Sequence, residues 1–177
     1  MRRHSTAVAL IALVLCSPFG LDLTLAQAVV ATPIGIEKLA DQHPAEYYRQ
    51  AAARLAEGKQ EEAVFLFYLG QLRYRAHLAA RPDLPRDGDP ALFASLSEVV
   101  GRPINVYAFG DIPALARTID AVLAYDTAHP DAFTPPSQFP KAHPGVRDGL
   151  VRMKDKMLTD ADSIRTQRTK NGLANRN

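Results

Sequence analysis

The side chains best suited to chemistry in this sequence lie between residues 71 and 81. Arg73, His77 and Arg81 recur at every fourth residue, so on a helix they would share one face. Arginine presents a fork of N–H donors that matches a carboxylate or a phosphate group. The spacing therefore predicts a binding surface for an anionic group, made of Gln71, Arg73, Tyr74, His77 and Arg81.

A second interpretation of this stripe involves no ligand. The C-terminal end of a helix is the negative end of its dipole, so basic side chains are favoured there. The stripe would then be the solvated face at the end of an otherwise buried helix. The sequence leaves both interpretations open.

The histidines outside the first 28 residues show no metal-binding pattern. No two of them stand four residues apart on a helix with a glutamate between them, as a zinc-protease motif requires. Three of the four precede a proline; the set is His43, His77, His129 and His143. We expect no metal site and no cofactor, although a site assembled from histidines and aspartates far apart in the sequence stays open.

Nucleophilic catalysis has no recognisable frame either. None of the serines after residue 28 stands in a Gly-x-Ser-x-Gly frame, and no glycine-rich phosphate loop is present. Glu98 and Asp111 could supply the two carboxylates that cleave a glycosidic bond. Helix capping and surface charge explain both residues as well, so an enzyme is less expected than a binding protein.

The N-terminal segment has the three parts of a secretory signal peptide. Arg2 and Arg3 precede an apolar stretch over residues 6–15, and the small-x-small triplet Ala26-Gln27-Ala28 follows. Pro18 and Gly20 interrupt the apolar run before it reaches the roughly 18 residues that a membrane span needs. We expect cleavage after Ala28, a periplasmic or secreted protein, and no stable membrane anchor afterwards.

Composition limits the remaining chemistry. The one cysteine, Cys16, lies in the predicted signal peptide, so the processed chain would have no thiol nucleophile, thiolate ligand or disulfide. The 21 lysines and arginines nearly balance the 19 aspartates and glutamates, for a net charge of +2. A nucleic-acid binder usually carries a strong basic excess on one face, so we expect no nucleic-acid partner.

The elements that position these side chains follow helical periodicity. Apolar residues recur at spacings of three and four, proline or aspartate opens several segments, and glycine closes them. The sequence predicts five main helices, near residues 44–57, 60–80, 89–100, 111–128 and 144–171. Residues 102–110 are ambiguous, and the prolines between 129 and 144 indicate a surface loop or hinge.

These elements predict an all-α fold, a compact bundle of about five helices in one domain. We assign residues 1–28 to the signal peptide, 29–43 to an N-terminal leader segment, 44–172 to the helical domain and 173–177 to a frayed tail. The centre of the bundle should be residues 63–69, because seven consecutive apolar residues cover every side of a helix. A buried strand is the alternative for this short run, but its polar flanks favour helix.

Within residues 45–72, a set of residues matches one repeated helical motif: Tyr47, Tyr48, Leu55, Gly58, Glu62, Ala63, Phe67 and Gly70. The pattern resembles a single tetratricopeptide-type or Sel1-type hairpin. In that family, small residues at the positions of Ala63 and Gly70 let two antiparallel helices pack closely, and the aromatic at Phe67 fills the space between them. Arg54 and Arg75 depart from the family pattern, and no second copy follows, whereas solenoids need three or more.

The resemblance implies a protein-binding scaffold, and the missing catalytic frames favour the same conclusion. We expect an exported helical module of the bacterial envelope that binds another envelope protein or a peptide. Its binding surface would include the 45–81 hairpin, with Arg73, Tyr74 and His77 near the rim. The alternative is a periplasmic hydrolase that acts on cell-wall material through Glu98 and Asp111.

Overall fold

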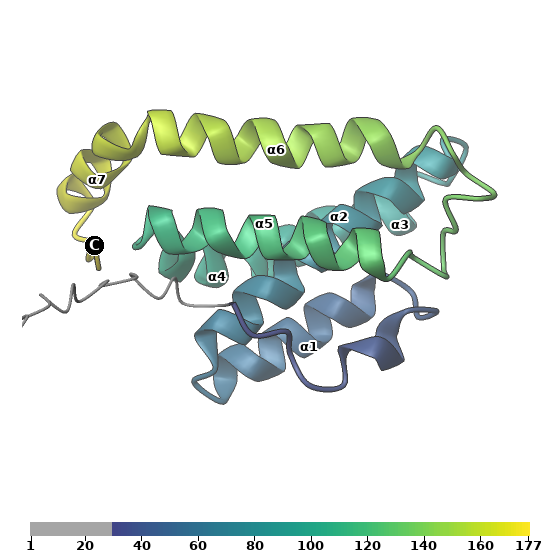
Figure 1. Cartoon of the computed structure of the whole chain (residues 1–177), viewed down its shortest axis with the longest axis horizontal. Helices are drawn as coiled ribbons and strands as arrows, with labels where there is room; N and C mark the ends of the chain where they lie inside the picture. Colours follow the sequence, from purple (N-terminus) through teal and green to yellow (C-terminus); the bar gives the residue numbers. More distant parts are fainter. Residues whose placement is uncertain (1–29) are drawn as a thin grey trace, which may run out of the picture.

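The computed structural model describes residues 30–177, and these residues form helices and loops without a strand (Figure 1). The predicted signal peptide, residues 1–28, lies outside the described part. A short 3-10 helix, Ile36–Leu39, precedes seven α-helices, and the all-α prediction is confirmed. The helices are α1 Ala45–Ala56, α2 Gln60–Ala80, α3 Asp89–Val99, α4 Gly101–Ala108, α5 Ile112–Ala128, α6 His143–Thr159 and α7 Ala161–Lys170.

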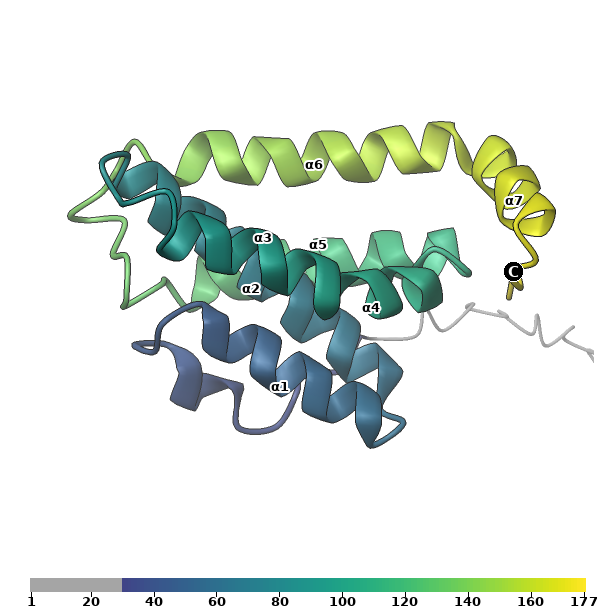
Figure 2. The ribbon, with the colours of Figure 1, turned by 180° about the vertical axis from the view of Figure 1, so that it is seen from behind.

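Helix α2 is the centre of the bundle. It contacts α1, α3, α4, α5 and α6, and every residue from Ala63 to Leu69 is at most 2% exposed. The helical prediction for residues 60–80 is confirmed, and the alternative of a buried strand is wrong. All sides of α2 need apolar residues because helices surround it on all sides (Figures 1 and 2).

Helices α1 and α2 form an antiparallel hairpin, joined by a turn at Gly58 with φ of 75°. Its close packing depends on Gly70, because a Cβ built there would lie 2.6 Å from Cβ of Tyr47. The expected close approach at Gly70 is therefore present. The hairpin alone does not identify a tetratricopeptide or Sel1 repeat, so that likeness remains a resemblance.

Residues 30–177 form seven α-helices in place of about five, because the ambiguous segment 102–110 contains most of α4 and the last predicted helix is divided into α6 and α7. Pro103 has no N–H to continue the hydrogen-bonding pattern of α3, and the chain starts α4 at Gly101. Gly101 also allows close contact with α2, since a Cβ there would lie 2.7 Å from the Phe67 ring. The last helix bends at Asp160, which lets α7 turn back toward α4 (Figure 1).

Both ends of the described chain are held against the bundle. In the leader, Ile36 and Leu39 are buried, and the Tyr47 hydroxyl donates a hydrogen bond to the Leu39 carbonyl. The prediction of a frayed tail at 173–177 is wrong. Its backbone accepts a hydrogen bond from Arg168 at Ala174, and the backbone N–H of Arg176 donates to the Gly110 carbonyl.

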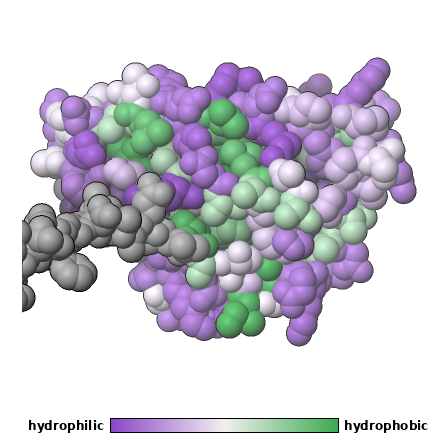
Figure 3. Space-filling view, in the orientation of Figure 1, coloured by the Kyte–Doolittle hydropathy of each residue, from purple (hydrophilic) through white to green (hydrophobic). Residues whose placement is uncertain are grey.

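The face of the molecule shown in Figure 3 is mostly polar, with separate apolar areas. Large apolar side chains that are well exposed in residues 30–177 include Ile34 and Val99. No helix in this part of the chain is both long enough and apolar enough to cross a bilayer.

Candidate functional site

The predicted stripe on α2 is largely buried. Arg73 is 2% exposed and His77 4%, and Tyr74 is fully buried. The interpretation of these residues as a solvated face is therefore wrong. Buried polar groups need hydrogen-bond partners inside the protein, so the partners of each side chain indicate what it does.

Arg73 is held by side chains of α1 and α5 and by the carbonyl of the residue that follows α5. Its Nε lies 3.3 Å from Oδ1 of Asp126 in α5, and its guanidinium also donates to the His129 carbonyl at 2.6 Å and to the Tyr47 hydroxyl. The second oxygen of Asp126 accepts a hydrogen bond from Arg147 in α6. This network joins α1, α2, α5 and α6 and leaves Arg73 directed into the protein, away from any ligand at the surface.

A second polar cluster lies where α1, α2 and α3 begin or end. Nε2 of His77 lies 2.7 Å from Oδ2 of Asp89, and Nε2 of His43 lies 3.2 Å from Oδ1 of the same carboxylate. The Tyr74 hydroxyl donates to the Asp89 carbonyl at 3.3 Å. Burial of Asp89 acts to raise its pKa, but the hydrogen bonds from His77 and His43 outweigh it and lower the pKa below the usual value.

The hydrogen bonds fix the protonation of His77. Its Nε2 faces a carboxylate and must donate, whereas its Nδ1 lies 2.8 Å from an NH group of Arg81, which can only donate. The ring is therefore neutral and carries its proton on Nε2. Burial lowers the pKa of His77 and favours this neutral form.

Arg81 is half-buried and packs with the loop after α5. Its guanidinium lies 4.7 Å from the Phe139 ring centroid and donates to the Thr134 hydroxyl at 3.3 Å. Four of the five predicted binding residues thus have partners within the protein. Gln71 is the member of the stripe that lines a cavity.

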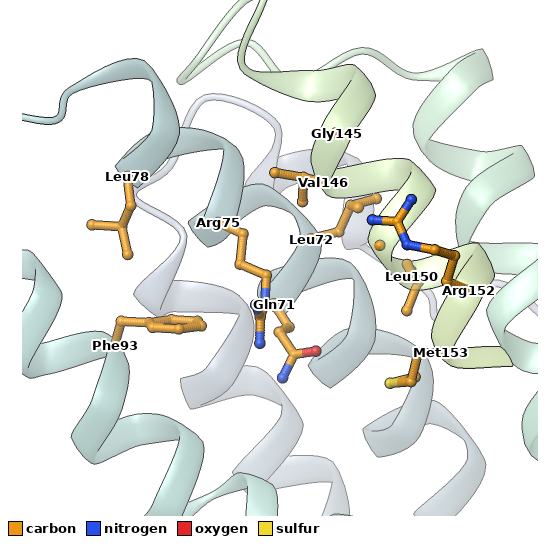
Figure 4. Close-up of a pocket in the computed structure, with 11 residues that line it drawn as sticks. Gln71, Leu72, Arg75, Leu78, Phe93, Gly145, Val146, Leu150, Arg152 and Met153 are labelled. Atoms are coloured by element: carbon orange, nitrogen blue, oxygen red, sulfur yellow. The ribbon is translucent and has the colours of Figure 1, made fainter. Parts of the chain in front are cut away.

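That cavity is a groove of about 650 Å³ between α2, α3 and α6 (Figure 4). Its volume is in the range of ligand pockets in proteins. Apolar side chains form most of its wall, and three polar side chains, Gln71, Arg75 and Arg152, border it. The apolar residues are Leu72, Leu78, Phe93, Val146, Leu150 and Met153.

Two arginines at this groove have no acidic partner. In residues 30–177, Arg75 and Arg152 form no salt bridge and no side-chain hydrogen bond. Arg75 lies over the Phe93 ring, 5.5 Å from its centroid, and Arg152 turns back along α6 toward Leu72 (Figure 4). The arrangement offers two guanidinium groups beside an apolar wall, which suits a ligand with acidic and apolar groups.

Sequence reasoning did not predict the groove or its arginines. One usable signal was the pair Gly145 and Gly149, which stand one helical turn apart and leave part of the α6 side of the groove without side-chain bulk. The three residues His43, His77 and Asp89 were also not predicted to meet. Their ligand atoms lie within 4.8 Å of one another, so they could hold a metal ion.

The carboxylates considered for hydrolysis have structural partners. Glu98 is exposed and forms a salt bridge with Arg102 one turn along the chain. Asp111 caps α5, since its Oδ1 accepts a hydrogen bond from the Ala114 N–H at 2.9 Å. Neither arrangement places the two carboxylates around a common substrate position.

Comparison of the chain with protein families, with curated proteins and with solved structures gave no match. The groove has free charged groups and space for a ligand, whereas the Arg73 network has neither. The groove is the candidate functional site.

Proposed function

We propose that this chain is a non-catalytic, exported binding module, and that the α2–α3–α6 groove holds a short acidic and apolar peptide segment of another envelope protein. The observation that carries the proposal is the pair Arg75 and Arg152, which face the groove without acidic partners in residues 30–177. Guanidinium groups bind carboxylates in a bidentate geometry, so Glu and Asp side chains are the complementary groups.

The apolar wall supports a peptide over a purely polar anion. Phe93 and Met153 lie on opposite sides of the groove, on α3 and α6, with Leu72 of α2 between them. A segment with apolar side chains on one face fits between two helices in the way that amphipathic helices occupy grooves. Methionine adapts its shape to such a segment.

The test uses a phage-displayed library of random peptides selected on the processed wild-type chain and on Arg75→Glu/Arg152→Glu. We expect the wild type to enrich peptides that combine Glu or Asp with Leu or Phe, because both parts of the groove are engaged. The enriched consensus, labelled with fluorescein, should bind the double variant at least about tenfold more weakly, or ~1.4 kcal/mol. Fluorescence anisotropy measures both dissociation constants.

Two further variants distinguish the groove from general charge attraction. Arg117→Glu changes the charge in the same direction on the exposed side of α5, away from the groove, and should leave binding unchanged. Gly149→Leu fills the groove without altering charge and should abolish binding. Equal binding by the double variant and the wild type, or no enrichment of acidic and apolar peptides, would show the proposal to be wrong.

Arg73→Ala would not serve as a test of binding. Arg73 is buried and paired with Asp126, so its removal leaves an unpaired buried carboxylate and destabilises the fold. Loss of binding in that variant would report unfolding.

A further inference from the structure

The cluster of His43, His77 and Asp89 has the composition of a transition-metal site. Three separate elements contribute to it: His43 precedes α1, His77 lies in the last turn of α2, and Asp89 is the first residue of α3. Their ligand atoms lie within 4.8 Å of one another. The cluster is separate from the proposed peptide groove, since none of the three residues lines it.

We propose that His43, His77 and Asp89 bind one Zn²⁺ ion through the two Nε2 atoms and a carboxylate oxygen. Two imidazoles and one carboxylate are a common three-ligand set for zinc, with metal–ligand distances of about 2.0–2.2 Å. In tetrahedral geometry these distances place ligand atoms about 3.3 Å apart. In the structure, Nε2 of His77 lies 2.7 Å from Oδ2 of Asp89 and Nε2 of His43 lies 3.2 Å from Oδ1, so both rings already face the carboxylate. For zinc to enter, His77 and the carboxylate must move apart from hydrogen-bonding distance to this wider spacing.

The cluster is open to solvent on one side. The His43 side chain is 35% exposed and the Asp89 side chain 24%, whereas the His77 side chain is 5% exposed. A metal ion can therefore enter beside His43, and a fourth ligand such as water can occupy the solvent side. The rings of Tyr74 and Phe133 pack edge-on against His43, with centroids 5.3 Å and 5.2 Å away, and restrict its position.

Metal binding requires a proton to move. Nε2 of His77 carries the proton in the metal-free network, so the neutral ring must take the tautomer with its proton on Nδ1 before Nε2 can coordinate zinc. His43 requires the same change of tautomer, and its Nδ1 then gives up the hydrogen bond that it accepts from the Ala45 N–H at 3.2 Å. Zinc then takes the place of the protons that both rings share with Asp89.

Arg81 opposes this change. Its NH group occupies the Nδ1 side of His77 and adds positive charge beside the ion. Arg81 also has other partners, the Thr134 hydroxyl and the Phe139 ring, so its guanidinium can leave His77 without losing all contacts. The Arg81 side chain therefore disfavours zinc binding, and a variant without its charge should bind zinc more tightly.

The experiment measures Zn²⁺ binding to the untagged processed chain by isothermal titration calorimetry at neutral pH. We expect one saturable site in the wild type and at least about tenfold weaker binding in His43→Ala and Asp89→Asn. Arg81→Gln should bind zinc about tenfold more tightly than the wild type. Mg²⁺ should not bind, because imidazole is a poor ligand for it.

Two controls make the result decisive. His129→Gln removes an exposed histidine outside the cluster and should leave the affinity unchanged. Ring ¹⁵N NMR of the wild type needs no substitution, and zinc should shift the His43 and His77 signals while those of His129 and His143 stay in place. No saturable binding, unchanged affinity in Asp89→Asn with an intact circular dichroism spectrum, or weaker binding in Arg81→Gln would overturn the proposal.

Discussion

At the scale of single residues, the polar side chains on α2 show that the same spacing can belong to a surface binding site or to a buried hydrogen-bond network. Arg73 and His77 have the types and spacing of an anion-binding stripe, yet their partners are internal. The partner of Arg73 is Asp126, which lies 53 residues further along the chain. Spacing within α2 gives the face that these side chains share, but it does not show which face the rest of the chain covers.

The buried carboxyl group of Asp131 should make the stability of the fold depend on pH. It is 3% exposed, its Oδ1 accepts a hydrogen bond from the Phe133 N–H, and its Oδ2 is buried without a partner. Burial raises the pKa of Asp131 above its usual value, and nearby Arg73 offsets only part of the effect, while the carboxylate of Asp126 adds to it. The folded state therefore binds more protons than the unfolded state between about pH 4 and the raised pKa.

We expect the ionisation of Asp131 to lower the free energy of unfolding as pH rises through this window. The sign follows because stability falls with pH wherever the folded state holds more protons. Asp131→Asn removes this titration. As pH rises through the window, the free energy of unfolding of the variant should therefore increase relative to that of the wild type, by about 1.4 kcal/mol per unit of pKa shift. Urea denaturation from about pH 4 to neutral measures the difference, with exposed Asp155→Asn as the control. Parallel pH curves for the wild type and Asp131→Asn would contradict the prediction.

At the scale of elements, most helices were predictable and most of their relative placement was not. Residues 63–69 indicated the central helix because a helix that is apolar on every side is stable only when it is buried. Asp111 indicated the start of α5 because aspartate is a favoured N-cap residue. The break at Asp160 was missed because apolar spacing continues across it, and residues 102–110, which contain most of α4, were left ambiguous. The groove could not be predicted, since it depends on how α6 lies over α2 and α3.

Glycine substitutions separate close packing from open space. Gly70→Ala adds a methyl group 2.6 Å from Cβ of Tyr47, so α1 must shift, at an expected cost of about 1–3 kcal/mol that exceeds the helix-propensity gain of ~1 kcal/mol. Gly149→Ala in α6 meets only the Arg152 guanidinium at 3.8 Å and should stabilise the fold by about 0.5–1 kcal/mol. Urea denaturation of both variants gives the comparison, and stabilisation by Gly70→Ala would contradict the close approach of α1 and α2.

At the scale of the whole molecule, α6 lies along α5 and is fixed near both ends. Near its start, Arg147 bonds Asp126 of α5, and further along Lys154 pairs with Asp120. Beyond its other end, α7 turns back so that Arg168 donates a hydrogen bond to the Val106 carbonyl of α4 (Figure 1). The groove lies under the first half of α6, so its width depends on how firmly these attachments hold the helix.

The C-terminal tail is the outermost of these attachments, and its removal should loosen one end of the molecule selectively. Ending the chain at Gly172 deletes the Ala174 carbonyl that Arg168 bonds and the Arg176 guanidinium that lies 3.6 Å from the Tyr107 ring centroid. α7 would then be held chiefly by its packing on α6 and by the hydrogen bond from Arg168 to the Val106 carbonyl of α4. Local unfolding exposes such poorly attached elements to hydrogen exchange before the core opens.

We therefore expect hydrogen exchange measured by mass spectrometry to rise in α7 and the end of α6 in the truncated chain, with little change in α1 and α2. Arg176→Ala should give an intermediate increase, since it removes the contact with Tyr107 and leaves the Ala174 carbonyl in place. Uniformly faster exchange in α2 would mean that the tail supports the entire core, and unchanged exchange in α7 would mean that it supports nothing. A selective effect would show that the C-terminal end of α6 opens independently of the α1–α2 hairpin.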